Sequence, residues 1–85
     1  MRTVEEEIDL HWMTVDEAIP GVDKFLDAAY QAGLYRVWIV HGKGTGILRR
    51  EVKRYLRKHP LVNSYRSAES NSGGAGATMV ELRDW

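Results

Sequence analysis

Strand-like and helix-like patterns alternate along this chain of 85 residues, and the alternation limits the possible folds more than any other feature. Apolar and polar side chains alternate over residues 4–11, whereas residues 36–41 contain a continuous apolar run. The patterns predict strands at residues 4–11, 36–41, 62–67 and 78–82, with helices between residues 14 and 33 and at 47–58.

The resulting βαβαββ order predicts an α/β domain with a four-stranded mixed sheet and two helices. Strand-helix-strand units in so short a chain favour parallel pairing with right-handed crossovers, and the last two strands are expected to form an antiparallel hairpin. The two helices lie either on one face of the sheet or on opposite faces. We expect a single domain over residues 1–85, with a flexible loop at 68–77 and a frayed tail at 83–85.

The sequence leaves open where the first helix starts and whether the second strand is covered on both faces. The first helix starts either at a capping box formed by Thr14 and Glu17 or at Pro20, and Gly33 ends it. The apolar run of the second strand indicates cover on both faces, unless Trp38 projects from one face. His59 precedes a proline and is expected only to cap the second helix.

Composition excludes several classes of protein. The chain is 44% hydrophobic and 28% charged, which is ordinary for a folded soluble domain, and it contains no cysteine for disulfides or thiolate metal sites. No apolar run approaches the roughly 20 residues that span a bilayer. We therefore expect no membrane association and a cytoplasmic location.

The formal net charge of zero conceals a strong asymmetry along the chain. Residues 1–35 carry eight acidic side chains against two basic ones, whereas residues 36–66 carry nine basic side chains against Glu51 alone. Such a chain can present one basic surface while it remains neutral overall.

A glycine-rich segment between the second strand and the second helix is the strongest local signal. It reads His41, Gly42, Lys43, Gly44, Thr45 and Gly46. Glycines bring backbone N–H groups close to an oxyanion, the helix N-terminus adds further donors, and Lys43 adds a positive charge. The segment predicts a phosphate site, the alternative being a tight turn that simply needs glycine.

The second helix continues this signal because one half of it is basic. Its basic side chains are Arg49, Arg50, Lys53, Arg54, Arg57 and Lys58. Beside the glycine-rich segment they predict contact with the phosphate backbone of DNA or RNA, and the alternative is an ordinary solvated face.

Asp9, His11 and His41 form a candidate catalytic group. If the first two strands are parallel neighbours, both histidines lie at one edge of the sheet beside the glycine-rich segment. Histidine can act as a general acid or base, and a carboxylate can orient it. Alternatively, Asp9 caps a turn and the histidines bind phosphate without chemistry, or the three residues ligate a divalent metal ion; no cofactor is otherwise indicated.

Trp12 and Trp38 have three open interpretations. They could stack on nucleobases, pack in the core, or contact a partner protein.

Three segments, in order, resemble the Smr (small MutS-related) domain. They are Ile8 to His11, His41 to Gly46, and Gly73 to Thr78 followed by Val80, Glu81 and Leu82. The resemblance covers nearly the whole chain. It implies a two-layer βαβαββ sandwich, binding to DNA or RNA, and nicking or endonuclease activity with Asp9, His11 and His41 as catalytic residues. It also implies membership of a larger MutS-family chain that acts in recombination control or on stalled ribosomes.

One departure from the family pattern concerns Trp12. It follows Ile8 to His11, the segment that resembles the family's LDxH motif, at the position where the family usually has glycine. Trp38 likewise stands where relatives tend to carry a polar or basic residue. Two alternatives to a nuclease follow: a DNA- or RNA-binding module without cleavage, and a protein-binding domain on an evolved or engineered surface that uses Trp12 and Trp38.

Overall fold

The computed structural model describes residues 6–42, 46–68 and 76–83. Its elements are β1 (Glu7–Asp9), α1 (Val15–Gln31), β2 (Arg36–Val40), α2 (Ile47–Lys58), β3 (Val62–Ser67) and β4 (Ala77–Leu82). The predicted βαβαββ order is confirmed.

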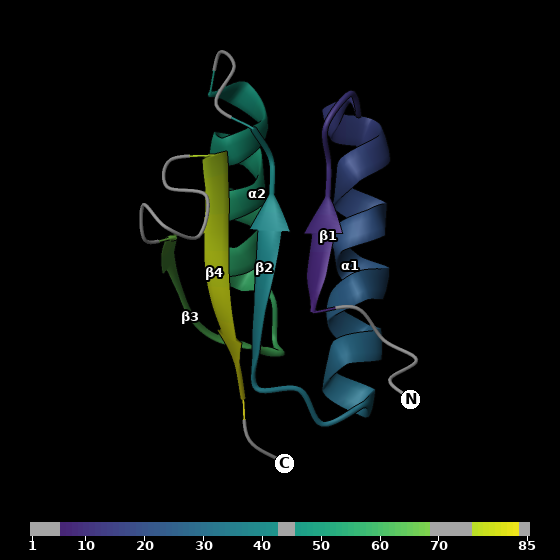
Figure 1. The fold of residues 1–85 in the computed structure, drawn as a ribbon, viewed down its shortest axis with the longest axis vertical. Coiled ribbons are helices and arrows are strands. Elements are labelled where there is room, and N and C mark those ends of the chain that lie inside the picture. Colours follow the sequence, from purple (N-terminus) through teal and green to yellow (C-terminus); the bar gives the residue numbers. More distant parts are fainter. Residues whose placement is uncertain (1–5, 43–45, 69–75, 84–85) are drawn as a thin grey trace.

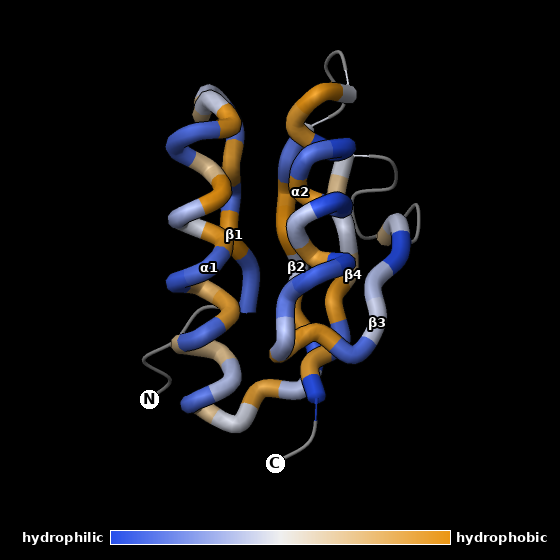
Figure 2. Tube along the Cα trace, turned by 180° about the vertical axis from the view of Figure 1, so that it is seen from behind, coloured by the Kyte–Doolittle hydropathy of each residue, from blue (hydrophilic) through white to orange (hydrophobic). Residues whose placement is uncertain are grey.

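The strands form one four-stranded sheet in the order β1-β2-β4-β3. β1 and β2 pair in parallel, whereas β4 is antiparallel to both β2 and β3, so the expected mixed sheet and terminal hairpin are confirmed. Both helices cover the same face of the sheet, as Figures 1 and 2 show from opposite sides. The molecule therefore has two layers.

The first helix begins at Val15 and continues through Pro20, so the alternative start at the proline is wrong. The capping box determines the start: Thr14 Oγ1 accepts from the Glu17 N–H at 3.2 Å, and Glu17 Oε1 accepts from the Thr14 N–H at 3.0 Å. After the helix Gly33 adopts a left-handed φ of 80°, which favours glycine.

The core lies between the sheet and the helices. The sheet contributes fully buried side chains from β2 and β4, and the helices contribute the apolar faces that Figure 2 shows turned toward the strands. The principal members are Leu10, Ala18, Val22, Leu26, Val37, Ile39, Val52, Leu56, Val80 and Leu82. Val37 and Ile39 face the helices, while Trp38 and Val40 on the opposite face are only partly buried. The expectation of cover on both faces of β2 is therefore wrong, because both helices lie on one side.

Three predicted boundaries differ from the structure. β1 is shorter than expected, because the chain turns away after the Leu10 N–H donates to the Val40 carbonyl at 2.7 Å. Of the loop predicted at 68–77 the structure describes only the ends, where the Ala68 N–H donates to the Ala77 carbonyl at 3.1 Å. Residues 69–75 lie outside the described residues, and their flexibility stays a prediction. The tail was predicted to fray at 83–85, but Arg83 is bonded: its N–H donates to the Leu61 carbonyl at 2.9 Å and its Nε to the Pro60 carbonyl at 2.8 Å. Residues 84–85 lie outside the described residues.

Candidate functional site

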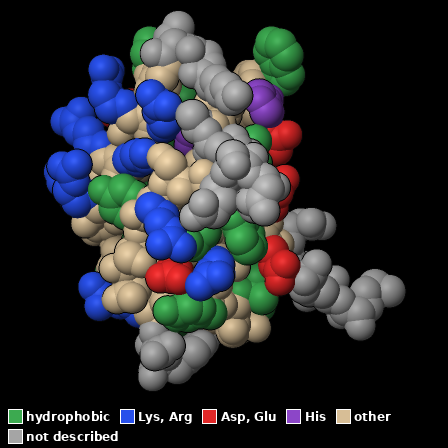
Figure 3. Space-filling model, turned by 60° about the vertical axis from the view of Figure 1, so that its left-hand side comes forward, with side chains coloured by type: hydrophobic (Ala, Val, Ile, Leu, Met, Phe, Trp, Pro, Cys, Tyr) green, Lys and Arg blue, Asp and Glu red, His purple; other side chains and the backbone are tan. Residues whose placement is uncertain are grey.

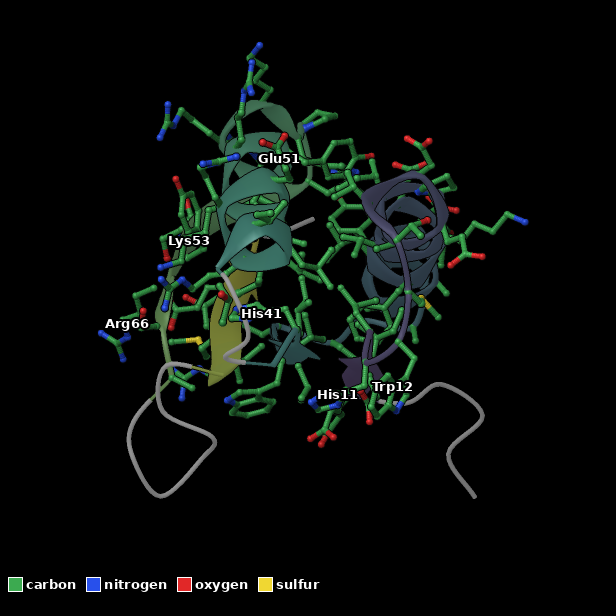
Figure 4. All side chains as sticks on the ribbon, turned by 90° about the horizontal axis from the view of Figure 1, so that it is seen from above. His11, Trp12, His41, Glu51, Lys53 and Arg66 are labelled. Atoms are coloured by element: carbon green, nitrogen blue, oxygen red, sulfur yellow. The ribbon has the colours of Figure 1, made fainter. Side chains whose placement is uncertain are left out.

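The three sequence motifs meet at the carboxyl end of the parallel strands. In the sheet, Asp9 is aligned with Val40 and Val40 with Ala77. The N–H groups of His41 and Gly42 both donate to the Gly76 carbonyl, at 3.0 and 2.9 Å. The two histidines consequently lie at one edge of the sheet, as predicted, and Figure 4 looks down on that edge.

Asp9 and His11 form an oriented pair. Asp9 Oδ1 accepts from the His11 backbone N–H at 2.9 Å and lies 2.7 Å from the ring Nδ1. The backbone hydrogen bond, and then the ring, lower the pKa of Asp9, so the carboxylate is charged at neutral pH. Since a carboxylate only accepts, the proton of a neutral His11 ring belongs on Nδ1 and the lone pair on Nε2.

His11 Nε2 lies against the backbone of Gly42. A β-carbon at position 42 would lie 3.0 Å from Nε2 and 3.1 Å from the ring carbon Cδ2. Gly42 also has a φ of 78°, a conformation that side chains rarely adopt. Two independent constraints therefore require glycine next to the His11 ring.

His41 has a different environment from His11. Its side chain is buried, Nδ1 lies 3.0 Å from the Gly42 carbonyl oxygen, and Nε2 lies 2.8 Å from Thr78 Oγ1. Burial lowers the pKa of His41, the Gly42 carbonyl opposes this shift, and the charges of Arg49 and Lys53 add to it. A neutral ring that donates from Nδ1 to Gly42 and accepts at Nε2 from Thr78 satisfies both contacts.

Thr78 is the residue of this site to which the sequence assigned no role. It is completely buried in β4 and its hydroxyl reaches the ring of His41 from 37 residues along the chain. The available signal was a hydroxyl group in a strand whose only other polar side chain is Glu81, because a buried hydroxyl requires a hydrogen-bond partner.

The glycine-rich segment is described only at its two ends. Gly42 and Gly46 have left-handed φ angles of 78° and 85°, and Gly46 immediately precedes α2. A β-carbon on Gly46 would lie 3.3 Å from Arg49 Nη2, so this guanidinium turns back toward the start of the helix. Lys43, Gly44 and Thr45 lie outside the described residues, and their contact with phosphate stays a prediction.

Four of the six basic residues of α2 fall into two groups. Arg49 and Lys53, here called the site-side cations, lie close enough to His41 to affect its pKa, and Lys53 Nζ donates to Ser67 Oγ on β3 at 3.1 Å. Arg50 and Arg54 instead form ion pairs with Glu51: Arg50 Nε lies 3.5 Å from Oε2, and Arg54 Nη1 lies 3.6 Å from Oε1. Figure 3 shows most of the visible Lys and Arg side chains toward one flank of the molecule, and most of the visible acidic side chains, with one exposed histidine, toward the other.

Trp12 is fully exposed to solvent and has a φ of 70°. A left-handed conformation costs a side-chain-bearing residue about 1–2 kcal/mol, and the exposed indole recovers none of it through packing. Core packing is therefore the wrong interpretation for Trp12. Trp38 is partly buried on the sheet face opposite the helices, aligned with Glu7 and Met79.

The candidate residues do not fit a shared divalent metal ion. Asp9 Oδ1 is bonded to His11, and both ring nitrogens of His41 have partners within the protein. In the part of the chain that the structure describes, no group of three His, Cys, Asp or Glu side chains is arranged to hold a metal.

A hollow of about 490 Å³ lies between the helices, lined by residues including Lys24, Asp27 and Lys58. At its wall the Tyr55 hydroxyl donates to Asp23 Oδ1 at 2.6 Å, and His59 Nε2 lies 3.0 Å from the same oxygen. Burial and then Asp23 raise the pKa of Tyr55 to about 12. His59 ends α2 as predicted and, in addition, ties that helix to α1.

Comparisons with known proteins identify one family. The model of the Smr domain matches residues 8–83. The protein named Endonuclease MutS2 from Clostridium tetani is 54% identical over 83 residues, which are 98% of this chain but 11% of that relative. The crystal structure of the Smr domain of Thermus thermophilus MutS2 superposes with a TM-score of 0.89 at 43% identity, over 91% of this chain and 96% of that one.

A second solved structure extends the likeness to a stand-alone protein. YdaL, a stand-alone small MutS-related protein from Escherichia coli, superposes with a TM-score of 0.88 at 34% identity, over 93% of this chain and 65% of that one. Among the helices that the structure describes, none is both long and apolar enough to cross a membrane.

Proposed function

Because the chain belongs to the Smr domain family, we propose that it binds DNA or RNA and cleaves a phosphodiester bond at the carboxyl ends of β1 and β2. One observation carries the proposal: Asp9 orients the His11 ring so that Nε2, the nitrogen away from the carboxylate, faces the backbone of Gly42. A carboxylate-oriented imidazole beside a glycine-rich turn and a helix N-terminus suits proton transfer next to a bound phosphate.

In this proposal His11 is the general base. His11 Nε2 takes a proton from the attacking water while the water oxygen forms a bond to phosphorus and the ester P–O bond breaks. The Asp9 carboxylate stabilises the imidazolium that results, as a buried aspartate does for the histidine of a catalytic triad. The leaving oxygen takes a proton from His11 or from solvent.

We assign His41 a supporting part in the same site. Both of its ring nitrogens have partners in the protein, so His41 holds Gly42 against β4 and keeps the turn in place for His11. Direct proton exchange between His41 and the substrate would first require loss of the Thr78 or the Gly42 contact.

Binding of the nucleic acid is assigned to the glycine-rich segment and the adjoining helix. The proposed contacts are Gly42, Lys43, Gly44, Thr45, Gly46, Arg49, Arg50, Lys53, Arg54 and Arg57. Among the basic side chains of this set that the structure describes, the site-side cations are the two whose charges lower the pKa of His41, and they are expected to contribute most.

The larger context is also a proposal. The chain spans 11% of the length of its Clostridium tetani relative, so we propose that it is one module of a MutS-family protein. The name of that relative, Endonuclease MutS2, favours a cleavage function for this chain. Recombination control and stalled ribosomes are the settings that the family resemblance implies.

Cleavage is tested by incubating the domain and its His11→Ala variant with supercoiled plasmid and with structured RNA. We expect nicking or cleavage that the variant loses by roughly 10²- to 10⁴-fold, the usual contribution of a general base. His41→Gln, which keeps a donor and an acceptor, should retain more activity than His11→Ala. Equal cleavage by wild type and His11→Ala would refute the assigned site.

The same experiment distinguishes a nuclease from a nucleic-acid-binding module without cleavage. If both proteins bind nucleic acid with a steep dependence on salt and neither cleaves it, the domain is a binding module. Absence of binding to plasmid and RNA alike would leave the protein-binding alternative.

A further inference from the structure

Trp12 carries two features that stability does not explain. Its side chain is fully exposed, and its backbone has a φ of 70° although it is not glycine. A bulky side chain in the left-handed region is a genuine outlier, and such outliers cluster at functional sites. A residue that gains no packing and strains its backbone requires an explanation in binding.

The position of Trp12 connects it to the proposed cleavage site. It follows His11 directly, and Figure 4 shows it on the side of His11 away from Lys53 and Arg66. A phosphate next to His11 Nε2 therefore has cations on one side and an exposed indole on the other. A strand whose phosphates run from the cations to His11 would continue toward Trp12.

The charges around Trp12 favour a base over a phosphate at this place. Asp16 and Glu17 stand in the first turn of α1, the helix that begins three residues after Trp12, at Val15. These carboxylates repel phosphate but tolerate a neutral nucleobase. An indole with both faces in solvent is well suited to stack on such a base.

We propose that Trp12 stacks on an unpaired nucleobase adjoining the phosphate that His11 attacks, and so makes the domain selective for single-stranded segments. Bases inside a duplex have their faces covered by neighbours and cannot stack on the indole without unstacking first. This inference rests on the proposed function and adds to it the substrate class.

The test measures binding in a His11→Ala background, so that no probe is cleaved. Affinities for a single-stranded oligonucleotide and for a blunt duplex are compared between this protein and its Trp12→Ala derivative. We expect roughly 5- to 160-fold weaker binding to the single strand, the range of base stacking on an aromatic side chain, and a much smaller change for the duplex. Trp12→Phe should retain most of the affinity.

Tyr35→Ala provides the matched control. Tyr35 is also an exposed aromatic residue, 49% accessible, and it lies at the opposite end of β2 from His41. Its removal should leave both affinities unchanged. Trp12→Gly should unfold at a higher urea concentration than wild type and still lose single-strand affinity, because glycine relieves the backbone strain and removes the indole.

Each remaining outcome decides against the inference. Unchanged single-strand affinity in Trp12→Ala overturns it and points to a protein partner, while cleavage that still depends on His11 keeps the proposed function intact. If Trp12→Ala weakens binding to the single strand and to the duplex equally, the proposed selectivity for single strands is wrong. If neither probe binds even before the Trp12 substitution, the proposed function fails and the inference fails with it.

Discussion

Asp9 Oδ1 holds His11 through two groups, the backbone N–H at 2.9 Å and the ring Nδ1 at 2.7 Å. Fixing both the main chain and the ring leaves the imidazole little freedom to rotate away from Gly42. The carboxylate also provides a negative charge beside the atom that becomes positive when Nε2 accepts a proton. Geometry and charge are therefore both supplied by one oxygen.

Asp9→Asn separates these two contributions. The amide oxygen can still accept from the His11 N–H, but the negative charge that stabilises an imidazolium is lost. We expect cleavage to decrease, by less than in His11→Ala, while the free energy of unfolding changes little because the pair is exposed. Initial rates of plasmid nicking and urea unfolding measure the two quantities. A wild-type rate in Asp9→Asn would contradict the charge contribution.

Gly42→Ala tests the contact between the turn and His11. The added methyl group would lie 3.0 Å from His11 Nε2, and the backbone has a φ of 78°. We expect a loss of about 1–2 kcal/mol in stability from the backbone and, in addition, loss of cleavage because the ring must move.

Gly33→Ala is the control for this change. Its φ is 80°, but a β-carbon there would meet nothing within 4 Å. It should lose similar stability and keep full cleavage after correction for the folded fraction. If both variants keep cleavage, the position of His11 against Gly42 is not needed for activity.

Arg49→Ala and Arg54→Ala distinguish the two sides of the basic helix. Both variants remove one positive charge from α2, but Arg49 turns back toward Gly46 whereas Arg54 lies 3.6 Å from Glu51. We expect Arg49→Ala to reduce the slope of log affinity against log salt by about 1, the value for one lost phosphate contact, and Arg54→Ala to change it much less. Nucleic-acid titrations at several salt concentrations measure this slope. Equal slopes in the two variants would contradict the assignment of Arg49 to the site.

The sequence allowed the element order and the meeting of the histidines to be predicted, because both depend on local patterns. The strand preference of residues 36–41 and the helix preference of residues 47–58 depend little on tertiary contacts. The parallel strands β1 and β2 end on the same side of the sheet, and this brings the two histidines together. The placement of both helices on one face required the strand order as well. β1 to β2 and β2 to β3 step in the same direction across the sheet, so two right-handed crossovers cover the same face.

The difference between the two histidines could not be predicted, because it depends on the register of distant strands. Thr78 reaches His41 only because β4 inserts between β2 and β3 and aligns Thr78 with Ile39. Nothing local to His41 indicates that hydroxyl or the burial of the ring. The exposure of Trp12 was equally hidden, because it depends on the turn in which the Met13 N–H donates to the Leu10 carbonyl at 3.1 Å and Trp12 has a φ of 70°.

The pH dependence of stability reports the burial of His41. Its folded-state pKa is lowered from the ordinary 6.5, first of all by burial, while the unfolded chain binds a proton near that ordinary value. Between the two values the unfolded state binds more protons, so the free energy of unfolding rises with pH. The stability that His41 contributes is therefore complete above pH 6.5 and is lost as the pH falls through that value toward the folded-state pKa.

His41→Gln should remove this contribution, because glutamine does not titrate and can still pair with Thr78 and Gly42. Urea unfolding at steps from about pH 7.5 to 5 should give a steeper decline for wild type than for the variant. Asp9, Asp23 and Glu81 also have lowered pKa values, but their ordinary values are 3.8, 3.8 and 4.5, so their contributions are lost at more acidic pH in both proteins. Parallel curves for wild type and His41→Gln would mean that His41 is protonated without cost, and that its ring is not held between Gly42 and Thr78 in solution.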